Sequence, residues 1–190
     1  MEDIARKEAY YTVKDHKKNW KNRTENMLVN PAISELGRVS KVILQRINKE
    51  LRERLGVKQI ISTQEAIKWF EDIKEKDKKS LLQFDIEKFY PSITEDLMEK
   101  AFKLAKEHTY IEDSSVDVIR ASSRSILFLD GVPWKKIKNP EADTTIGSYD
   151  GAERAELVGL YLLWLLTINH DTKVAEKEDI LLYRDDGLAV

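Results

Sequence analysis

Apolar residues recur at helical spacing along much of this chain, and the pattern predicts a series of helices. The expected helices cover 34–55, 63 to about 73, 92 to about 105, 113–124 and 150 to about 168. Gly56 is a natural stop for the first of them, and Thr63, Ser92 with Glu95, and Asp150 are start signals for three others. The residues expected to face the core are Leu36, Val39, Ile43, Ile47 and Leu51 in the first helix, Ala66, Ile67, Phe70 and Ile73 in the second, and Leu97, Met98, Ala101, Leu104 and Ala105 in the third.

Short apolar runs between these helices predict strands. Residues 80–86 carry few polar side chains, so we expect a central strand there, and 59–62 form a short strand or connector. The turn Asp130-Gly131 predicts a hairpin over 125–136, and Pro133 indicates that its second strand lies at an edge.

A last hairpin is expected from the apolar runs 180–182 and 188–190, with Tyr183-Arg184-Asp185-Asp186 at its tip. The segment 10–30 is expected to be irregular or extended. Strands that alternate with helices in this order predict an α+β fold, with a small antiparallel sheet packed on helices. At 190 residues, the chain is expected to form a single domain.

Composition narrows the class of protein. The chain has no cysteine, which excludes disulfides, cysteine-ligated zinc and thiol nucleophiles. Its first residues are charged and lack an apolar signal core. The longest apolar stretch, 157–168, is too short to span a bilayer and is typical of a buried helix. We therefore expect a protein of the cytoplasm or nucleus, neither secreted nor bound to a membrane.

The charge is unevenly distributed. Residues 1–60 contain 14 Lys and Arg against 8 Asp and Glu, whereas 61–190 contain 18 against 26. A basic first part and an acidic second part would suit a protein that holds a polyanion with one and a metal with the other. Ordinary variation between solvated surfaces explains the same numbers.

Three aspartates are the candidate chemical groups. Asp185 and Asp186 are adjacent at the tip of the last hairpin, and Asp85 ends the expected strand over 80–86. Adjacent carboxylates repel each other, so a fold that places them at a tight turn favours a bound cation. Three such groups suffice to hold two Mg²⁺ ions for phosphoryl transfer. Taken singly, Asp85 fits a turn or cap residue, and Asp185-Asp186-Gly187 fits a plain hairpin turn.

The arrangement resembles the reverse transcriptase family. The segment Phe84-Asp85-Ile86-Glu87-Lys88-Phe89-Tyr90-Pro91-Ser92-Ile93 is similar to the family's first palm motif, and Tyr183-Arg184-Asp185-Asp186 is similar to its third. The resemblance implies a right-hand polymerase with an RRM-like palm, in which about 1–79 would be fingers-like and about 80–190 palm with an interspersed fingers hairpin. It implies an RNA-directed DNA polymerase that uses an RNA template, a DNA or RNA primer and dNTPs.

The resemblance also implies roles for single residues. Asp85, Asp185 and Asp186 would be the catalytic ligands of two Mg²⁺ or Mn²⁺ ions. Tyr90 would occupy the steric-gate position, where its ring would clash with a ribose 2′-OH and favour dNTPs; a core aromatic is the alternative. Gly151 would match the glycine of the middle motif, which lets the backbone approach the nucleotide. The candidate triphosphate contacts are Lys14, Lys17 and Arg23.

The chain also departs from the family pattern. Asp150 stands where the family usually has Gln, and no Ser-Pro follows. Met27 stands where an Arg often helps to hold the triphosphate. The chain stops soon after Asp186, so we expect the thumb to be absent and the chain to be a fingers–palm fragment of a divergent, retroelement-like branch. The alternatives are a catalytically inert nucleic-acid-binding fragment and the palm of an RNA-dependent RNA polymerase.

Overall fold

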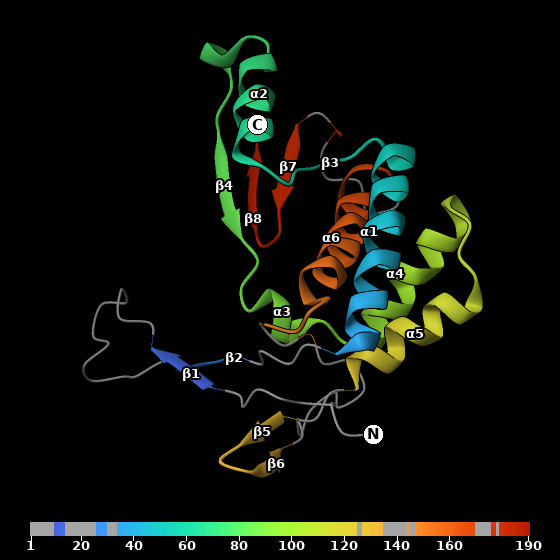
Figure 1. Ribbon diagram of the computed structural model, residues 1–190. Coiled ribbons are helices and arrows are strands. Elements are labelled where there is room, and N and C mark those ends of the chain that lie inside the picture. The colour runs from blue at the N-terminus through green and yellow to red at the C-terminus, as the bar shows by residue number, and fades with distance from the viewer. Residues whose placement is uncertain are drawn as a thin grey trace.

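A layer of helices packs against one face of a small sheet, which confirms the α+β class (Figure 1). The computed structural model describes residues 10–13, 26–29, 34–124, 127–134, 144, 147–169, 176–177 and 179–190. The helical layer consists of α1 (Glu35–Leu55), α4 (Glu95–His108), α5 (Asp113–Ser123) and α6 (Gly151–Thr167). The remaining helices are α2 (Thr63–Asp72), the short α3 (Phe89–Ser92) and the 3₁₀ turn η1 (Lys76–Lys78).

The four-stranded sheet has the order β3-β7-β8-β4. Its strands are β3 (Lys58–Gln59), β4 (Leu82–Asp85), β7 (Ile180–Tyr183) and β8 (Asp186–Ala189). The expected antiparallel sheet is partly wrong, because β3 pairs in parallel with β7 while the other pairs are antiparallel. The expectation that 80–86 is a central strand is also wrong. Strand β4 lies at an edge, and Leu82 at its start is 62% exposed.

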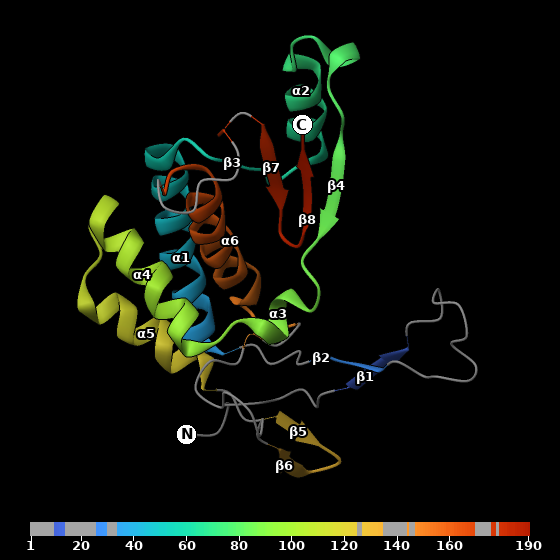
Figure 2. The same cartoon turned by 180° about the vertical axis from the view of Figure 1, so that it is seen from behind.

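Helix α6 lies between the sheet and the other helices of its layer, which explains its long apolar run (Figures 1 and 2). Leu157, Leu160 and Leu163 are buried, and the sheet contributes Ile180 and Leu182 to the same core. Each fully buried leucine stabilises the fold by about 1.5–3 kcal/mol. This packing fixes β7, and with it the hairpin tip, relative to the helices.

Strand β7 is buried on both faces. Its residues alternate, so that Ile180 and Leu182 face the core around α6 and Leu181 faces the opposite side. Leu181 and the buried Trp69 of α2 line one cleft on that opposite side. The expected apolar face of α2 is therefore wrong in part, because Ile67 and Phe70 are 54% and 46% exposed.

The period of α1 was predicted well, but its buried face is rotated from the one expected. Leu36 and Val39 are 47% and 50% exposed, whereas the polar Ser40 and Asn48 are buried. Both polar side chains hydrogen-bond to the start of α6: Ser40 to the carboxylate of Asp150 and Asn48 to a backbone carbonyl. The pattern of hydrophobic residues cannot predict buried polar contacts of this kind.

Helix caps are partly as expected. Gly56 has a left-handed backbone (φ 65°) and ends α1, as predicted. Two start signals are displaced: the cap of α2 is Ser62 rather than Thr63, and the cap of α4 is Thr94 rather than Ser92. Each displaced cap accepts a hydrogen bond from the backbone three residues on, as N-caps do.

Two small hairpins complete the described structure. Strands β5 (Leu127–Leu129) and β6 (Val132–Trp134) form the predicted hairpin, and its turn residues Asp130 and Gly131 both have positive φ (52° and 72°). Strands β1 (Tyr10–Val13) and β2 (Asn26–Val29) pair in the segment expected to be irregular or extended. Among the described residues, no helix combines the length and the apolar character needed to cross a bilayer. The division into fingers-like and palm-like parts stays a prediction.

Candidate functional site

The last hairpin forms as expected but turns more tightly, because Asp186 belongs to β8 and not to the turn. Tyr183 pairs with Asp186, so the turn consists of Arg184 and Asp185 alone. Arg184 has φ 55°, the sign that a type II′ turn requires at its first central position. The backbone oxygen of Asp185 accepts a hydrogen bond of 2.8 Å from the backbone nitrogen of Ile86, just after β4. The tip is therefore tied to the strand that carries Asp85.

The register of the sheet brings two of the three candidate carboxylates together. Asp85 on β4 lies directly opposite Asp186 on β8, and Tyr183 flanks Asp186 on its other side. Directly opposed residues have Cβ atoms about 4.5–5.5 Å apart and point to the same face. Both carboxylates are exposed to solvent. Like charges so placed destabilise a sheet, and a cation between them removes that cost.

The third carboxylate, Asp185, lies in the turn itself. Among the described residues, no group of three or more His, Asp or Glu side chains is arranged to hold a metal ion. The donors present still fit Mg²⁺, because Mg²⁺ keeps several waters and is usually bound by one or two carboxylates together with substrate phosphates. Asp85 and Asp186 would be those carboxylates.

Tyr90 lies beside the hairpin tip. It belongs to α3, where its ring meets that of Phe89 edge-on at 6.0 Å, and it is half-buried against the core. Burial raises the pKa of the Tyr90 hydroxyl, the charge of Arg184 opposes this, and Asp185 adds to it. Tyr90 therefore stays neutral near pH 7, within the electric field of the turn. Its ring packs against the core, and the steric-gate role stays a prediction.

Two glutamates of α6, Glu153 and Glu156, add to the rise in the pKa of Tyr90, and the sequence did not indicate them. Glu153 is 7% exposed, and its Oε1 contacts Lys41 Nζ at 3.3 Å and Gln45 Nε2 at 3.1 Å. Burial raises the pKa of Glu156, against the charge of Arg52. In the sequence, these two glutamates are marked only by their position, three residues apart near the start of an otherwise apolar helix.

Asp150 and Gly151 lie at the buried start of α6. Asp150 occupies the cap position but makes no cap hydrogen bond, so the expected capping role is wrong. Its carboxylate instead accepts hydrogen bonds from Ser40 (2.5 Å) and Ser122 (2.6 Å) and forms an ion pair with Arg154. This cluster joins α1, α5 and α6. Gly151 is buried beside it, and its approach to a nucleotide stays a prediction.

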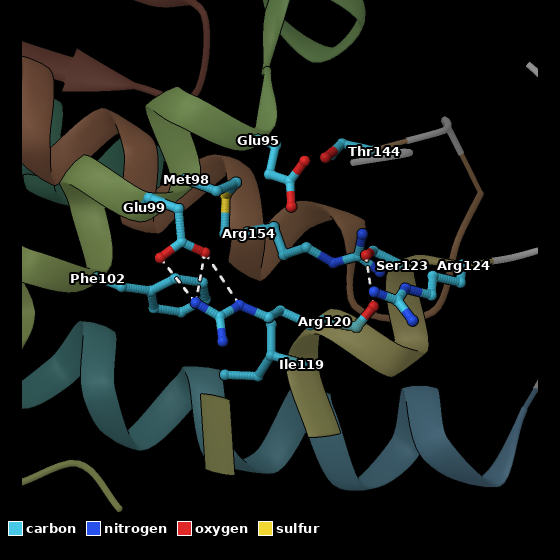
Figure 3. Close-up of a pocket in the computed structure, with 10 residues that line it drawn as sticks. All are labelled: Glu95, Met98, Glu99, Phe102, Ile119, Arg120, Ser123, Arg124, Thr144 and Arg154. Carbon is cyan, nitrogen blue, oxygen red and sulfur yellow. Dashed lines mark hydrogen bonds and ion pairs between the residues drawn. The ribbon is translucent and has the colours of Figure 1, made fainter. Parts of the chain in front are cut away.

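A small cavity between α4, α5 and α6 reaches the same cluster (Figure 3). Arg120 of α5 closes one side by donating two hydrogen bonds of 2.7 Å to the carboxylate of Glu99 on α4. Arg154 and the buried Thr144 line the cavity as well. Its volume of about 30 Å³ suits a water molecule and excludes a nucleotide.

Three predicted phosphate contacts, Lys14, Lys17 and Arg23, lie outside the described residues. The backbone of Met27 is placed, in β2 opposite Thr12. A scan of protein-family models finds no match, and a search of curated protein sequences finds no significant similarity.

Proposed function

We propose that this chain is the fingers–palm part of an RNA-directed DNA polymerase of the reverse transcriptase type. The observation that carries the proposal is the register of β4 and β8, which sets Asp85 opposite Asp186 beside a two-residue turn. This is the local structure that a Tyr-x-Asp-Asp hairpin and an upstream Asp would need in order to share metal ions. The proposed partners are an RNA template, a DNA or RNA primer and a dNTP, inside the cell.

Each residue near the tip has a defined role in the proposal. Asp85 and Asp186 would hold metal from opposite strands, and Asp185 would complete the set from the turn. Two bound Mg²⁺ ions supply a lowered pKa for the primer 3′-OH and a counter-charge for the leaving pyrophosphate. Tyr90 would stand beside the sugar of the incoming nucleotide and exclude a 2′-OH by its bulk. Gly151 would let the start of α6 approach the nucleotide.

Primer extension on an RNA template tests the proposal. The chain should extend a primer with dNTPs in the presence of Mg²⁺ or Mn²⁺, and Asp186→Asn should reduce the rate at least about 100-fold by removing a ligand. Asp77→Asn is the matched control, because Asp77 is also exposed but lies in η1, away from the tip. Equal loss in both variants, or none in Asp186→Asn, would refute the assignment.

The gate has its own test. Tyr90→Ala should raise the use of rNTPs relative to dNTPs, while Tyr90→Phe should not, because the ring and not the hydroxyl excludes the 2′-OH. Equal use of both nucleotides by the unmodified chain would remove the gate and favour an RNA-dependent RNA polymerase.

Met27 favours a second candidate, a nucleic-acid-binding domain without catalytic activity. An uncharged side chain stands there at a position where the family often has an Arg for the triphosphate. Calorimetric titration with Mn²⁺ separates the two candidates. Binding that is weakened at least tenfold by Asp186→Asn supports the enzyme, and binding that ignores the substitution supports the inert domain.

A further inference from the structure

A second cleft lies at the other end of the β7–β8 hairpin from the proposed site. It is bounded by the end of α1, strand β3, helix α2 and the segment up to Lys79, and its volume is about 710 Å³. Clefts of about 300–1,000 Å³ are typical of small-molecule sites. Neither the proposed chemistry nor the resemblance uses this cleft.

The floor of the cleft is apolar. Trp69 and Leu181 are buried there, and Ile60 and Ile73 are half-buried along it. The partly exposed isoleucines leave apolar surface that a flat ligand can cover. Such a floor accepts a ring system better than it accepts a hydrated ion alone.

The rim of the cleft is basic. Five basic side chains line it against three acidic ones. Of these, Lys79 is neutralised by Asp179 at 3.3 Å. The basic residues left are Arg52, Lys58, Lys68 and Lys74, against the carboxylates of Glu65 and Asp72.

The three lysines among them are available to a ligand. Lys58, Lys68 and Lys74 are exposed, and in the described part of the chain none of them has a carboxylate within ion-pair distance. Lys58 pairs in register with Leu181, so its side chain lies on the cleft side of the sheet.

We infer that this cleft binds a nucleoside phosphate, either free or as a unit of a single strand, with the base over Ile60 and Ile73 and the phosphate among the three lysines. Lysine is a common phosphate partner, and any base can offer a flat face to an apolar floor. The inference does not need the proposed polymerase function.

The test measures binding in the presence of a chelator, so that it does not depend on metal. The probe is a fluorescein-labelled thymidine oligomer of about eight nucleotides, read by anisotropy over roughly 50–200 mM salt. The triple variant Lys58→Glu, Lys68→Glu and Lys74→Glu should weaken binding at least about tenfold. It should also make the plot of log K against log salt concentration less steep, by about 2 in the magnitude of the slope, since each phosphate contact to a single strand contributes about 0.7. An unchanged affinity and slope would overturn the inference.

A matched triple variant controls for overall charge. Arg46→Glu, Lys49→Glu and Lys103→Glu change the charge equally at exposed positions outside the cleft. This variant should bind the probe with a slope like that of the unmodified chain, and an equal loss in both variants would overturn the inference. Circular dichroism and urea unfolding check that both variants fold.

Competition identifies the ligand class. Thymidine monophosphate should displace the probe better than inorganic phosphate does, because only the nucleotide covers the floor. A poly-glutamate peptide that competes as well as the nucleotide would overturn the inference in favour of an acidic peptide. Asp186→Asn should leave probe binding in the cleft unchanged, so that failure of the proposed polymerase and failure of this inference give different results.

Discussion

Gly187 gives the sharpest test of the site's architecture. It follows Asp186 on β8 and lies opposite Phe84 on β4. A Cβ added to Gly187 would lie 2.0, 2.2 and 2.5 Å from three carbon atoms of the Phe84 ring, whereas ordinary contact begins at 3.4 Å. The ring therefore covers the bare backbone of the glycine, and Gly187→Ala must push it away.

The size of the effect follows from overpacking. Adding a methyl group to a filled site costs about 1–3 kcal/mol, and Phe84 is itself packed against the core. We expect Gly187→Ala to lower the free energy of unfolding by that amount. Because Asp85 follows Phe84 in the same strand, the shift of β4 should also move Asp85 away from Asp186 and weaken Mn²⁺ binding.

Urea unfolding of four proteins measures the effect: the unmodified chain, Gly187→Ala, Phe84→Ala and the double variant. Phe84→Ala removes the three atoms closest to the added methyl group. In that background Gly187→Ala should cost less than about 0.5 kcal/mol, which gives a coupling energy of at least about 0.5 and up to about 3 kcal/mol. Additive effects within about 0.5 kcal/mol would refute the packing described for the two strands.

Three further predictions concern the surroundings of the site. Asp150→Asn should lower the free energy of unfolding by about 3–5 kcal/mol, because it breaks the buried ion pair between Asp150 and Arg154; a loss below about 1 kcal/mol in urea unfolding would contradict this. Thr94→Ala should cost about 1 kcal/mol through loss of the α4 cap, and Ser92→Ala clearly less; equal costs would argue against Thr94 as the cap. Burial raises the pKa of Glu156 above its ordinary 4.5. Protonated Glu156 therefore stabilises the folded state, and this contribution to the free energy of unfolding is present below about pH 4.5 and is lost as the pH rises through the folded-state pKa. Glu156→Gln removes this pH dependence. The free energy of unfolding of the variant, compared with that of the unmodified chain, should therefore rise between about pH 4 and 7, and parallel pH profiles would contradict this.

Local signals predicted the elements of this fold well. Helical periodicity located α1 and α4, Gly56 ended α1, and Asp130-Gly131 made the expected turn. These features depend on a few neighbouring residues, and so they can be inferred from the sequence. The buried face of α1 could not be inferred in this way, because the partner that buries Asn48 lies on α6, more than 100 positions away.

The same limit applies to the candidate site. The spacing of Asp85 and the Tyr183–Asp186 tip indicated that the two belong together, but no local rule fixes which residue of β8 opposes Asp85. A shift of one position would have turned Asp186 to the other face. The role of Glu153 was hidden for a related reason, since its partners Lys41 and Gln45 come from a different helix.

The order of the strands in the sheet has a consequence for how the chain is made. Among the described strands, β3 pairs with β7 and β4 with β8, which come about 100 positions later: Lys58 pairs with Leu181 and Leu82 with Ala189. At about 5–20 residues per second on a ribosome, β4 waits roughly 5–20 s for its neighbour. During that time the edge that begins at Leu82 is open to other nascent chains, so aggregation competes with folding until the β7–β8 hairpin is synthesised.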